Sequence, residues 1–379
     1  MAKKPFSKGK EKADDVEKTG KTIKAGTLKE LCKQINKEHG EDGIINGSAV
    51  VKVKSFPTGI LSIDLASGCG GIPQGRIIEI FGSESSGKTT FCLTVAAACQ
   101  KHYFEDKKRH GVVAFIDAEH ALDISWAKKL GVSFEEDRFL VAQPNNGNDA
   151  SDIIKHLCES AFVDLIIIDS VAALQPKSII DGDFDDANIG AHAKLIGKLL
   201  SRINPFIKNG TTVLLTNQIR NKIGVMFGNP EDTTGGKSLK FYTSMRISLR
   251  NSGKVKDGDI QVANNVHMTY AKNKVGIPYA TCEFKIHFTD NLSGIDPIEP
   301  LLRLSPEITR NGNFYKYGNI NLGNGPTAAT MKLLSEPDLC DEIMKKTYSN
   351  LVQVSISEND LDNDPILDGD IDGDTNLSD

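Results

Sequence analysis

The sequence predicts an α/β fold built on a doubly wound, mostly parallel sheet. Across residues 55–289, apolar runs of strand length alternate with segments of helical period. The runs 77–81, 111–116 and 163–168 each stop at a glycine or an aspartate. Because parallel strands place their carboxyl ends along one edge of a sheet, these stops predict a binding site at that edge.

Later parts of the chain predict two further features. Runs at 244–250, 265–272 and 283–288 have few helices between them, which predicts an antiparallel extension at one edge of the sheet. Residues 290–350 mix helix and strand patterns around 312–317 and predict a small α+β C-terminal domain.

The composition bounds the class of protein. At 39% hydrophobic and 25% charged residues, the 379-residue chain can form one large core and a small satellite domain. No run of about 18 apolar residues is present, so no membrane anchor is expected. The seven cysteines are scattered and never spaced C-x-x-C. This pattern favours reduced thiols in the cytoplasm and excludes a four-cysteine zinc ribbon.

Both ends of the chain carry strongly biased charge. Residues 1–24 hold eight lysines against four acids, and residues 351–379 hold nine acids and no lysine or arginine. Of the totals of 45 basic and 50 acidic residues, this leaves 37 of each in the body. The basic head (1–25) and the acidic tail (351–379) lack apolar periodicity and are expected to be disordered. A neutral body attracts a polyanion only through a local basic stripe.

The most specific motif is G-x-x-x-x-G-K-[ST], which matches Gly82, Ser83, Glu84, Ser85, Ser86, Gly87, Lys88 and Thr89. It lies between the strand 77–81 and a helix expected over 89–100, the context in which this loop binds phosphates. The glycines let backbone N–H groups turn inward, Lys88 reaches the outer phosphates, and the Thr89 hydroxyl ligates Mg²⁺. The motif predicts a nucleoside triphosphate site, with Thr90 among its contacts.

Two acidic residues at strand ends predict the rest of a phosphoryl-transfer site. Asp169 follows the run 163–168 and is expected beside the Mg²⁺ hydration shell, although an aspartate here also suits a simple turn cap. Glu119 shares a face with Asp117 by the two-residue period of a strand, and is predicted to orient or deprotonate the attacking water. His120 has no neighbours that complete a metal or nucleophile set and is expected to be structural.

Residues 221–237 match neither a helix nor a strand period. They hold four glycines, a proline and two acidic residues, yet also Ile223, Val225, Met226 and Phe227. A glycine-rich segment with apolar tips beside basic residues suits a loop that grips phosphates and inserts side chains between bases. An ordinary active-site lid is the alternative.

Several longer strings together resemble the bacterial-type RecA recombinase family across about residues 27–340. The strings are SID (62–64), GGIPQGR (70–76), FIDAEHALD (115–123), DSVAAL (169–174), NQIR (217–220) and KIGVMFGNPE (222–231). The resemblance implies a RecA-like P-loop NTPase core (55–289). It also implies an N-terminal polymerisation helix and strand (26–54), with Leu28, Leu31 and Ile35 packing on an adjacent protomer. The alternative is a helix packed on its own core.

For DNA, the resemblance implies two binding loops, at about 180–190 and 221–237. The candidate DNA-binding residues are Ile189, Lys194, Arg220, Lys222, Ile223, Met226, Phe227, Gly235 and Gly236. Gln218, just before the second loop, is implied to sense the γ-phosphate and so to order that loop. Where the family commonly carries a basic residue after the first loop, this chain has Lys194, which keeps the charge but lacks the bidentate fork of an arginine. Asn251, His267 and Thr269 replace basic residues for a second DNA strand, with Arg250, Lys254 and Lys256 nearby.

For ATP, the resemblance implies contacts within and between protomers. Asp123 and Trp126 match positions that flank the adenine, although Trp126 also suits a half-buried core position. Lys272 and Lys274 match lysines that reach a neighbouring protomer's ATP. Phe241 matches an interface aromatic, with a plain core role as the alternative.

The implied function is a DNA-dependent ATPase that forms helical filaments on single-stranded DNA and catalyses pairing and strand exchange. The implied ligands and partners are ATP, Mg²⁺, single- and double-stranded DNA, further copies of the chain, a repressor co-protease substrate and a single-strand-binding protein. A ring-forming, helicase-type NTPase motor is an alternative that the second-loop string disfavours. A non-hydrolysing filament regulator is another, disfavoured by the intact Lys88, Glu119 and Asp169.

Overall fold

The computed structural model describes residues 27–39, 53–135, 137–182, 190–221, 231–289 and 292–358. The helices are α1 (Leu28–His39), α2 (Leu61–Ser67), α3 (Lys88–Lys101), α4 (Ile124–Lys129), α5 (Gly147–Ser160), η2 (Val171–Ala173), α6 (Lys177–Ile180), α7 (Ala191–Ile207), α8 (Gly236–Tyr242), α9 (Ile298–Leu304), α10 (Pro326–Ser335) and α11 (Pro337–Glu358). The strands are β1 (Ser55–Phe56), β2 (Ile72–Pro73), β3 (Ile77–Gly82), β4 (Tyr103–Phe104), β5 (Arg109–His110), β6 (Val113–Asp117), β7 (Phe139–Ala142), β8 (Leu165–Asp169), β9 (Thr212–Asn221), β10 (Glu231–Thr233), β11 (Met245–Asp257), β12 (Ile260–Asn273), β13 (Thr281–Thr289), β14 (Leu292–Ile295), β15 (Ile308–Asn311), β16 (Phe314–Tyr317) and β17 (Ile320–Asn324).

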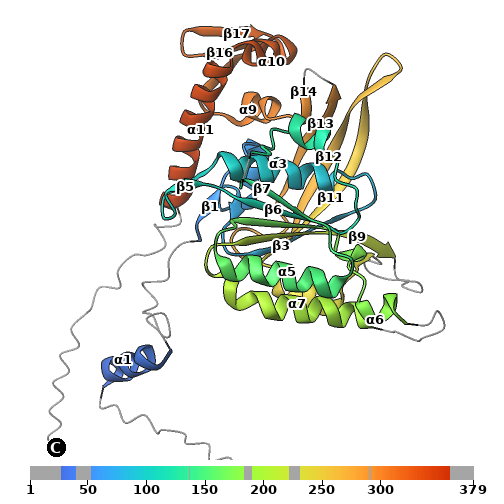
Figure 1. Cartoon of the computed structure of the whole chain (residues 1–379). Helices are drawn as coiled ribbons and strands as arrows, with labels where there is room; N and C mark the ends of the chain where they lie inside the picture. The colour runs from blue at the N-terminus through green and yellow to red at the C-terminus, as the bar shows by residue number, and fades with distance from the viewer. Residues whose placement is uncertain are drawn as a thin grey trace, which may run out of the picture. The chain divides into compact units, whose positions relative to one another are not determined.

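A mixed sheet forms the centre of the unit that follows residue 52 (Figure 1). Within the described residues it has ten strands, in the order β14-β13-β12-β11-β3-β9-β8-β6-β7, with β10 paired to β9. The pairs from β11 through β7 are parallel, and β12, β13 and β14 extend the sheet antiparallel. The predicted parallel centre and antiparallel edge are therefore confirmed.

Helices cover both faces of the parallel strands, as the doubly wound prediction requires. Adjacent side chains of a strand point to opposite faces. In β3, Ile78 and Ile80 enter a core shared with α3, whereas Ile77 enters a core shared with α5 and α7. Figure 1 shows α3 on one side of the sheet and α5 with α7 on the other. Burial on both faces explains why these strands read as continuous apolar runs.

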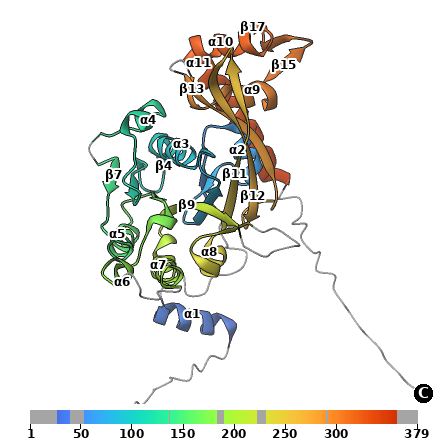
Figure 2. The same ribbon diagram turned by 90° about the vertical axis from the view of Figure 1, so that its right-hand side faces the viewer.

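The C-terminal segment has its own antiparallel sheet and core (Figures 1 and 2). Strands β15, β16 and β17 pair in chain order and pack with α9, α10 and α11. Leu61 of α2 belongs to the same buried cluster, so this core is continuous with the beginning of the larger unit. Tyr348 of α11 also donates a hydrogen bond to the buried Asp64 carboxylate.

The structure differs from two expected boundaries. The acidic tail was expected to be disordered from residue 351, but α11 continues to Glu358. Residues 351–358 contain no glycine or proline, and Leu351 packs against the C-terminal core, so the helix continues there despite the nearby charge. The second loop was expected to be irregular over 221–237, but 231–233 pair with β9 and 236–237 begin α8. The basic head, residues 40–52 and residues 359–379 lie outside the described residues.

Candidate active site

The register of the parallel strands brings the predicted site residues to one edge of the sheet. Gly82 at the end of β3 pairs with Gln218 of β9, and Asp169 at the end of β8 pairs with Asp117 of β6. Since the carboxyl ends of parallel strands lie together, residues from four separate parts of the chain meet at this edge.

The loop between β3 and α3 has the backbone that a phosphate cradle needs. Gly87, the residue before α3, has a φ of 92°, and a Cβ there would lie 2.4 Å from Ile286 Cδ1. A Cβ on Gly82 would lie 2.3 Å from the carbonyl oxygen of Leu249. Only glycine fits both positions without displacing a neighbour. The first N–H groups of α3 have no partner within the helix, so they are available to an anion.

The hydroxyl of Ser86 shows that the loop suits a phosphate group. Its oxygen is buried and has no hydrogen-bond partner among the described residues. Ser86 lines a cavity of about 390 Å³ together with Gly87, Lys88, Thr89 and Thr90. An unpartnered buried hydroxyl is costly, and phosphate oxygens are strong acceptors for it. The loop therefore fits a nucleotide phosphate chain.

Lys88 is held at the mouth of this loop. Its ammonium donates to the carbonyl oxygens of Gly82 (3.2 Å) and Ser83 (2.7 Å). Burial lowers the pKa of Lys88 from its ordinary value, while the nearby carboxylates of Asp169 and Glu119 act in the opposite direction. The amine can exchange carbonyl partners for phosphate oxygens, which are stronger acceptors for a cation.

Asp169 and Thr89 form a pair of oxygen ligands suited to Mg²⁺. The Thr89 hydroxyl donates to Asp169 Oδ2 at 2.6 Å, and the Thr216 hydroxyl donates to Asp169 Oδ1 at 2.5 Å. A carboxylate and a hydroxyl are the hard oxygen donors that Mg²⁺ prefers, and this ion keeps most of its waters. Asp169 therefore contacts the phosphate-loop threonine rather than only capping a turn.

Glu119 and Asp117 occupy different surroundings despite their two-residue spacing. Asp117 ends β6 and is buried, where its carboxylate accepts from the N–H groups of Ala121 (3.0 Å) and Leu122 (3.4 Å) and from Gln143. Glu119 lies beyond the strand end, is exposed, and accepts a hydrogen bond from the Ser170 hydroxyl. Asp117 supports the turn, and Glu119 remains available to a water molecule.

The candidate base pocket combines the predicted residues Asp123 and Trp126 with others that the sequence did not indicate. Asp123 caps α4 by accepting from the N–H of Trp126, and the Trp126 indole donates to the Thr90 hydroxyl at 3.2 Å. The Phe288 ring lies 6.5 Å from that of Trp126 between centroids. The cavity beside the phosphate loop is also lined by Asn264, Val266, Ile286 and Phe288. These residues sit on β12 and β13, about 180 to 200 residues beyond the loop in the chain, and carry no local motif.

Gln218 and the candidate DNA-binding residues lie beyond the same edge. Gln218 and Arg220 are exposed near the end of β9, and Lys194 is exposed in the first turn of α7. Gly235 precedes α8 and Gly236 begins it, with φ values of 98° and 75°. Ile189, Lys222, Ile223, Met226 and Phe227 lie outside the described residues.

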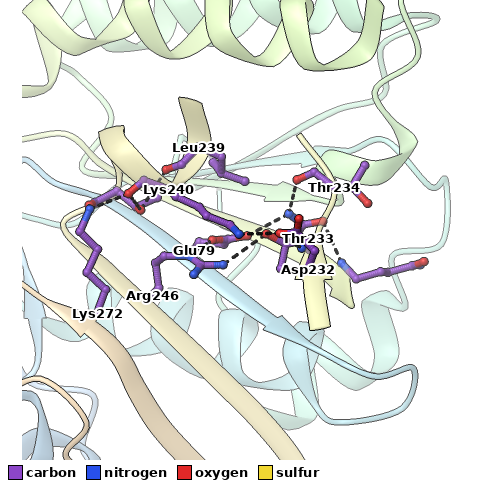
Figure 3. Close-up of polar contacts among 11 residues, drawn as sticks. Glu79, Asp232, Thr233, Thr234, Leu239, Lys240, Arg246 and Lys272 are labelled. Carbon is purple, nitrogen blue, oxygen red and sulfur yellow. Dashed lines mark hydrogen bonds and ion pairs between the residues drawn. The ribbon is translucent and has the colours of Figure 1, made fainter. Parts of the chain in front are cut away.

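The candidate interface residues differ in exposure. Phe241 is 74% exposed, which argues against a plain core role. Lys274 is exposed, whereas the Lys272 ammonium donates to the carbonyl oxygens of Lys240 (2.6 Å) and Thr243 (2.7 Å) at the end of α8 (Figure 3). Burial, followed by the charges of Lys274 and Arg246, lowers the pKa of Lys272.

Among the positions considered for binding a second DNA strand, His267 has a carboxylate neighbour. Its Nδ1 lies 3.3 Å from Glu283 Oε1.

No described helix is both long and apolar enough to cross a membrane. No cluster of three or more His, Cys, Asp or Glu side chains suited to a metal occurs in the described part of the chain.

Comparison with known proteins identifies the family of this chain. The family model described as "RecA N-terminal domain" matches residues 26–293. Protein RecA of Wolinella succinogenes is 44% identical over 318 residues, which cover 83% of this chain and 88% of the relative. Protein RecA of Rhodopirellula baltica is 43% identical over 325 residues, covering 85% and 84%. Protein RecA of Sulfurimonas denitrificans is 42% identical over 327 residues, covering 85% and 92%. With its phosphate loop, strand-end carboxylates and doubly wound sheet, this chain belongs to the RecA family.

Proposed function

We propose that this chain carries out DNA-dependent ATP hydrolysis and strand exchange with the residues that meet at the carboxyl edge of its parallel sheet. The observation that carries the proposal is the register: Gly82 of the phosphate loop is paired directly with Gln218, three residues before Asn221, the last residue of β9. Nucleotide binding and the start of the second DNA loop therefore share one strand pair.

In the proposed nucleotide site, backbone N–H groups of the loop, the Ser86 hydroxyl and Lys88 bind the phosphate chain. Thr89 and Asp169 hold Mg²⁺, which, when bound, offsets charge on the phosphate oxygens. Glu119 orients the attacking water and accepts its proton, with Ser170 fixing one carboxylate oxygen. Trp126, Asp123 and Phe288 bind the base. This assignment is supported by the cavity shared by the loop and β13.

Gln218 is proposed as the γ-phosphate sensor. Its side chain is exposed at the edge beside Gly82, while its backbone belongs to the strand that continues into the second DNA loop. The Gln218 amide contacts the γ-phosphate only when ATP is bound. The ATP-bound and ATP-free states therefore differ in interaction energy, as a switch requires. Arg220, Lys194 and the glycines at the start of α8 then contact the DNA backbone together with loop residues 222–230.

The filament proposal assigns the exposed Phe241 and Lys274 and the partly buried Lys272 to the contact between protomers, together with the N-terminal segment 26–54. Lysines from a neighbour would offset charge that develops on ATP. A single-strand-binding protein and a repressor substrate are proposed as further partners. The cytoplasm is the proposed compartment, where the seven unpaired thiols stay reduced.

Steady-state ATP hydrolysis, measured with and without single-stranded DNA, tests this function together with electron microscopy. The wild type is expected to hydrolyse ATP faster with DNA and to form helical filaments with ATP. Lys88→Ala is expected to lose both properties, whereas Lys129→Ala, an equivalent change on the exposed face of α4, is expected to keep them. Closed rings would support the helicase-type motor. Filaments without turnover would support the non-hydrolysing regulator.

A further inference from the structure

A buried carboxylate that the phosphate chemistry does not use lies in the middle of β3. Glu79 has 0% exposure and accepts hydrogen bonds from Asn217 Nδ2 (2.9 Å) and from Arg246 Nε (Figure 3). These partners come from β9 and β11, the strands on either side of β3. A buried charge is costly unless it is paired and hydrogen-bonded, so the three side chains form one interdependent group.

Asn217 extends this group to the residues that flank the second DNA loop. Its Nδ2 also donates to the carbonyl oxygen of Thr234 at 2.7 Å, and its Oδ1 accepts from the N–H of Gln218 at 2.9 Å. The amide of Asn217 therefore holds the backbone of the proposed phosphate sensor and the backbone just before α8. Because Glu79 Oε1 and the Thr234 carbonyl are both acceptors, they require the Nδ2 side of the Asn217 amide and leave Oδ1 to accept from Gln218.

Arg246 reaches the same segment by a second route. Its Nη2 donates to the Thr233 hydroxyl at 3.2 Å, and its guanidinium lies over the Phe81 ring, 4.6 Å from the centroid. Phe81 immediately precedes the phosphate loop. The planar fork of an arginine can bind a carboxylate and a hydroxyl while stacking on a ring, whereas a lysine cannot make all these contacts at once.

We propose that Glu79 and Arg246 are positioning residues that couple ATP turnover to DNA by tying Gln218 to Thr233 and Thr234. Neither Glu79 nor Arg246 lines the cavity beside the phosphate loop. The pair acts through Asn217 and through the Thr233 hydroxyl. A displacement of the Gln218 backbone then moves the residues before α8, because a hydrogen-bonded buried network transmits displacement that separate flexible side chains would absorb. The inference rests on the proposed sensor role of Gln218.

The test separates positioning from ordinary stabilisation. Glu79→Gln leaves the partly buried Arg246 charge without its counter-charge, and this change alone destabilises a fold. The double variant Glu79→Gln/Arg246→Met removes both charges and is expected to regain stability. The measured quantity is the ratio of the ATP turnover rate with single-stranded DNA to the rate without it. Both variants are expected to lower this ratio by about 5-fold or more, while the KM for ATP changes less.

Asp164 provides a matched control. It is also a fully buried carboxylate, and it accepts from Lys107 Nζ at 2.6 Å and from Arg109 Nη1 at 2.5 Å. It precedes β8, so it lies at the amino end of the sheet, away from the site. Asp164→Asn is expected to lower thermal stability and to leave the DNA stimulation ratio unchanged. A loss of stimulation in Asp164→Asn would show that general destabilisation explains the effect, and would overturn the positioning role.

Gln218→Ala distinguishes the two proposals. If Gln218→Ala and the Glu79/Arg246 double variant both lose stimulation, both roles are supported. If Gln218→Ala loses stimulation but the double variant keeps the wild-type ratio, the positioning role is overturned and the sensor role stands. If Gln218→Ala keeps the wild-type ratio, the sensor role fails, and the coupling route through Asn217 fails with it.

Discussion

At the scale of single residues, the site depends on side chains whose neighbours set their roles. Glu119 and Asp117 are both acidic and lie two residues apart, yet one is exposed beside Ser170 and the other is enclosed by the N–H groups of a turn. Lys88 and Asp169 are likewise defined by contacts, the first with loop carbonyls and the second with two hydroxyls. Glu119 and Asp117 carry the same charge, but only Glu119 is exposed to water. A carboxylate that acts as a general base must reach the water whose proton it accepts.

Glu119→Gln is expected to lower kcat for ATP hydrolysis by about 100-fold or more, the scale of a lost general base. Nucleotide affinity should remain near that of the wild type, because the phosphate loop is unchanged. Glu105→Gln makes the same chemical change on the exposed β4–β5 turn and should leave turnover unaltered. Single-turnover hydrolysis and equilibrium ATP binding measure the two quantities. Near-normal turnover in Glu119→Gln would assign the water-activating role to another residue.

At the scale of elements, α11 is anchored by a polar contact in an otherwise apolar core. Tyr348 donates to the carboxylate of Asp64, which also accepts from the hydroxyl (2.7 Å) and the N–H (2.9 Å) of Thr58. Burial raises the pKa of Asp64 to about 6, although these hydrogen bonds act against the rise. Because the folded state binds this proton more tightly than the unfolded state, protonation of Asp64 stabilises the fold. This stabilisation is fully present below about pH 4 and is lost as the pH rises through about 6.

Tyr348→Phe is expected to destabilise α11 more at pH 7.5 than at pH 5. Above the Asp64 pKa of about 6 the lost bond is to a charged carboxylate, and below it the bond is to a neutral one. Bonds to charged groups contribute about 1.5–3 kcal/mol, roughly twice the neutral value. Hydrogen exchange of the α11 amides at both pH values, corrected for intrinsic rates, measures this difference. Ser349→Ala, an exposed neighbour on α11, is the control. Equal losses at both pH values would show that Asp64 does not titrate in this range.

At the scale of the whole molecule, filament formation requires exposed surfaces that contact a second copy of the chain. Phe241 on α8 is 74% exposed, and Phe162 after α5 is 75% exposed, yet only the first lies beside Lys240 and the Lys272 contact. A large exposed aromatic near the centre of an interface contributes more to binding than one outside it.

Phe241→Ala is expected to weaken assembly by about 2 kcal/mol per contact, the scale of an interface hot spot. Phe162→Ala removes the same ring from a comparably exposed position and should leave assembly unchanged. Filament length by electron microscopy, with the protein concentration at half-assembly from light scattering, compares the two variants. Equal behaviour of both variants would place the contact between protomers elsewhere.

The acidic tail is expected to compete with DNA for a local basic stripe on a neutral body. Of the nine acids in 351–379, one is Glu358 at the end of α11, so deleting 359–379 removes eight and spares the helix. The deletion should strengthen binding of single-stranded DNA and lower the Mg²⁺ needed for it, while turnover on saturating DNA stays near the wild-type value.

A tail of unchanged length with its aspartates replaced by asparagine separates charge from bulk. DNA titrations across Mg²⁺ and salt concentrations should give the same strengthening for the neutral tail as for the deletion, because counterion release depends on charge. Superimposed curves for the full-length and truncated chains would indicate that the tail recruits a partner instead.

The sequence by itself determined the class of fold, the phosphate loop and the strand-end carboxylates. Each of these is local: a run of apolar residues that stops at Gly82 or Asp169, and a motif whose residues are adjacent in the chain. The same local reasoning set boundaries for the acidic tail and the second loop that differ from the helix and strand bounds of the structure. Leu351 packs against distant residues, and strand 231–233 exists because β9 lies beside it.

Only the tertiary structure decided which distant residues complete the site. Phe288 and Ile286 line the cavity beside the phosphate loop from β13, and Glu79 meets Asn217 and Arg246 across three strands. No spacing in the sequence encodes these contacts, because strand order and register bring them together. Glu79 occurs in an otherwise apolar strand and would be read as an exception to the pattern. Its burial between two paired donors gives the physical reason for a charge at that position.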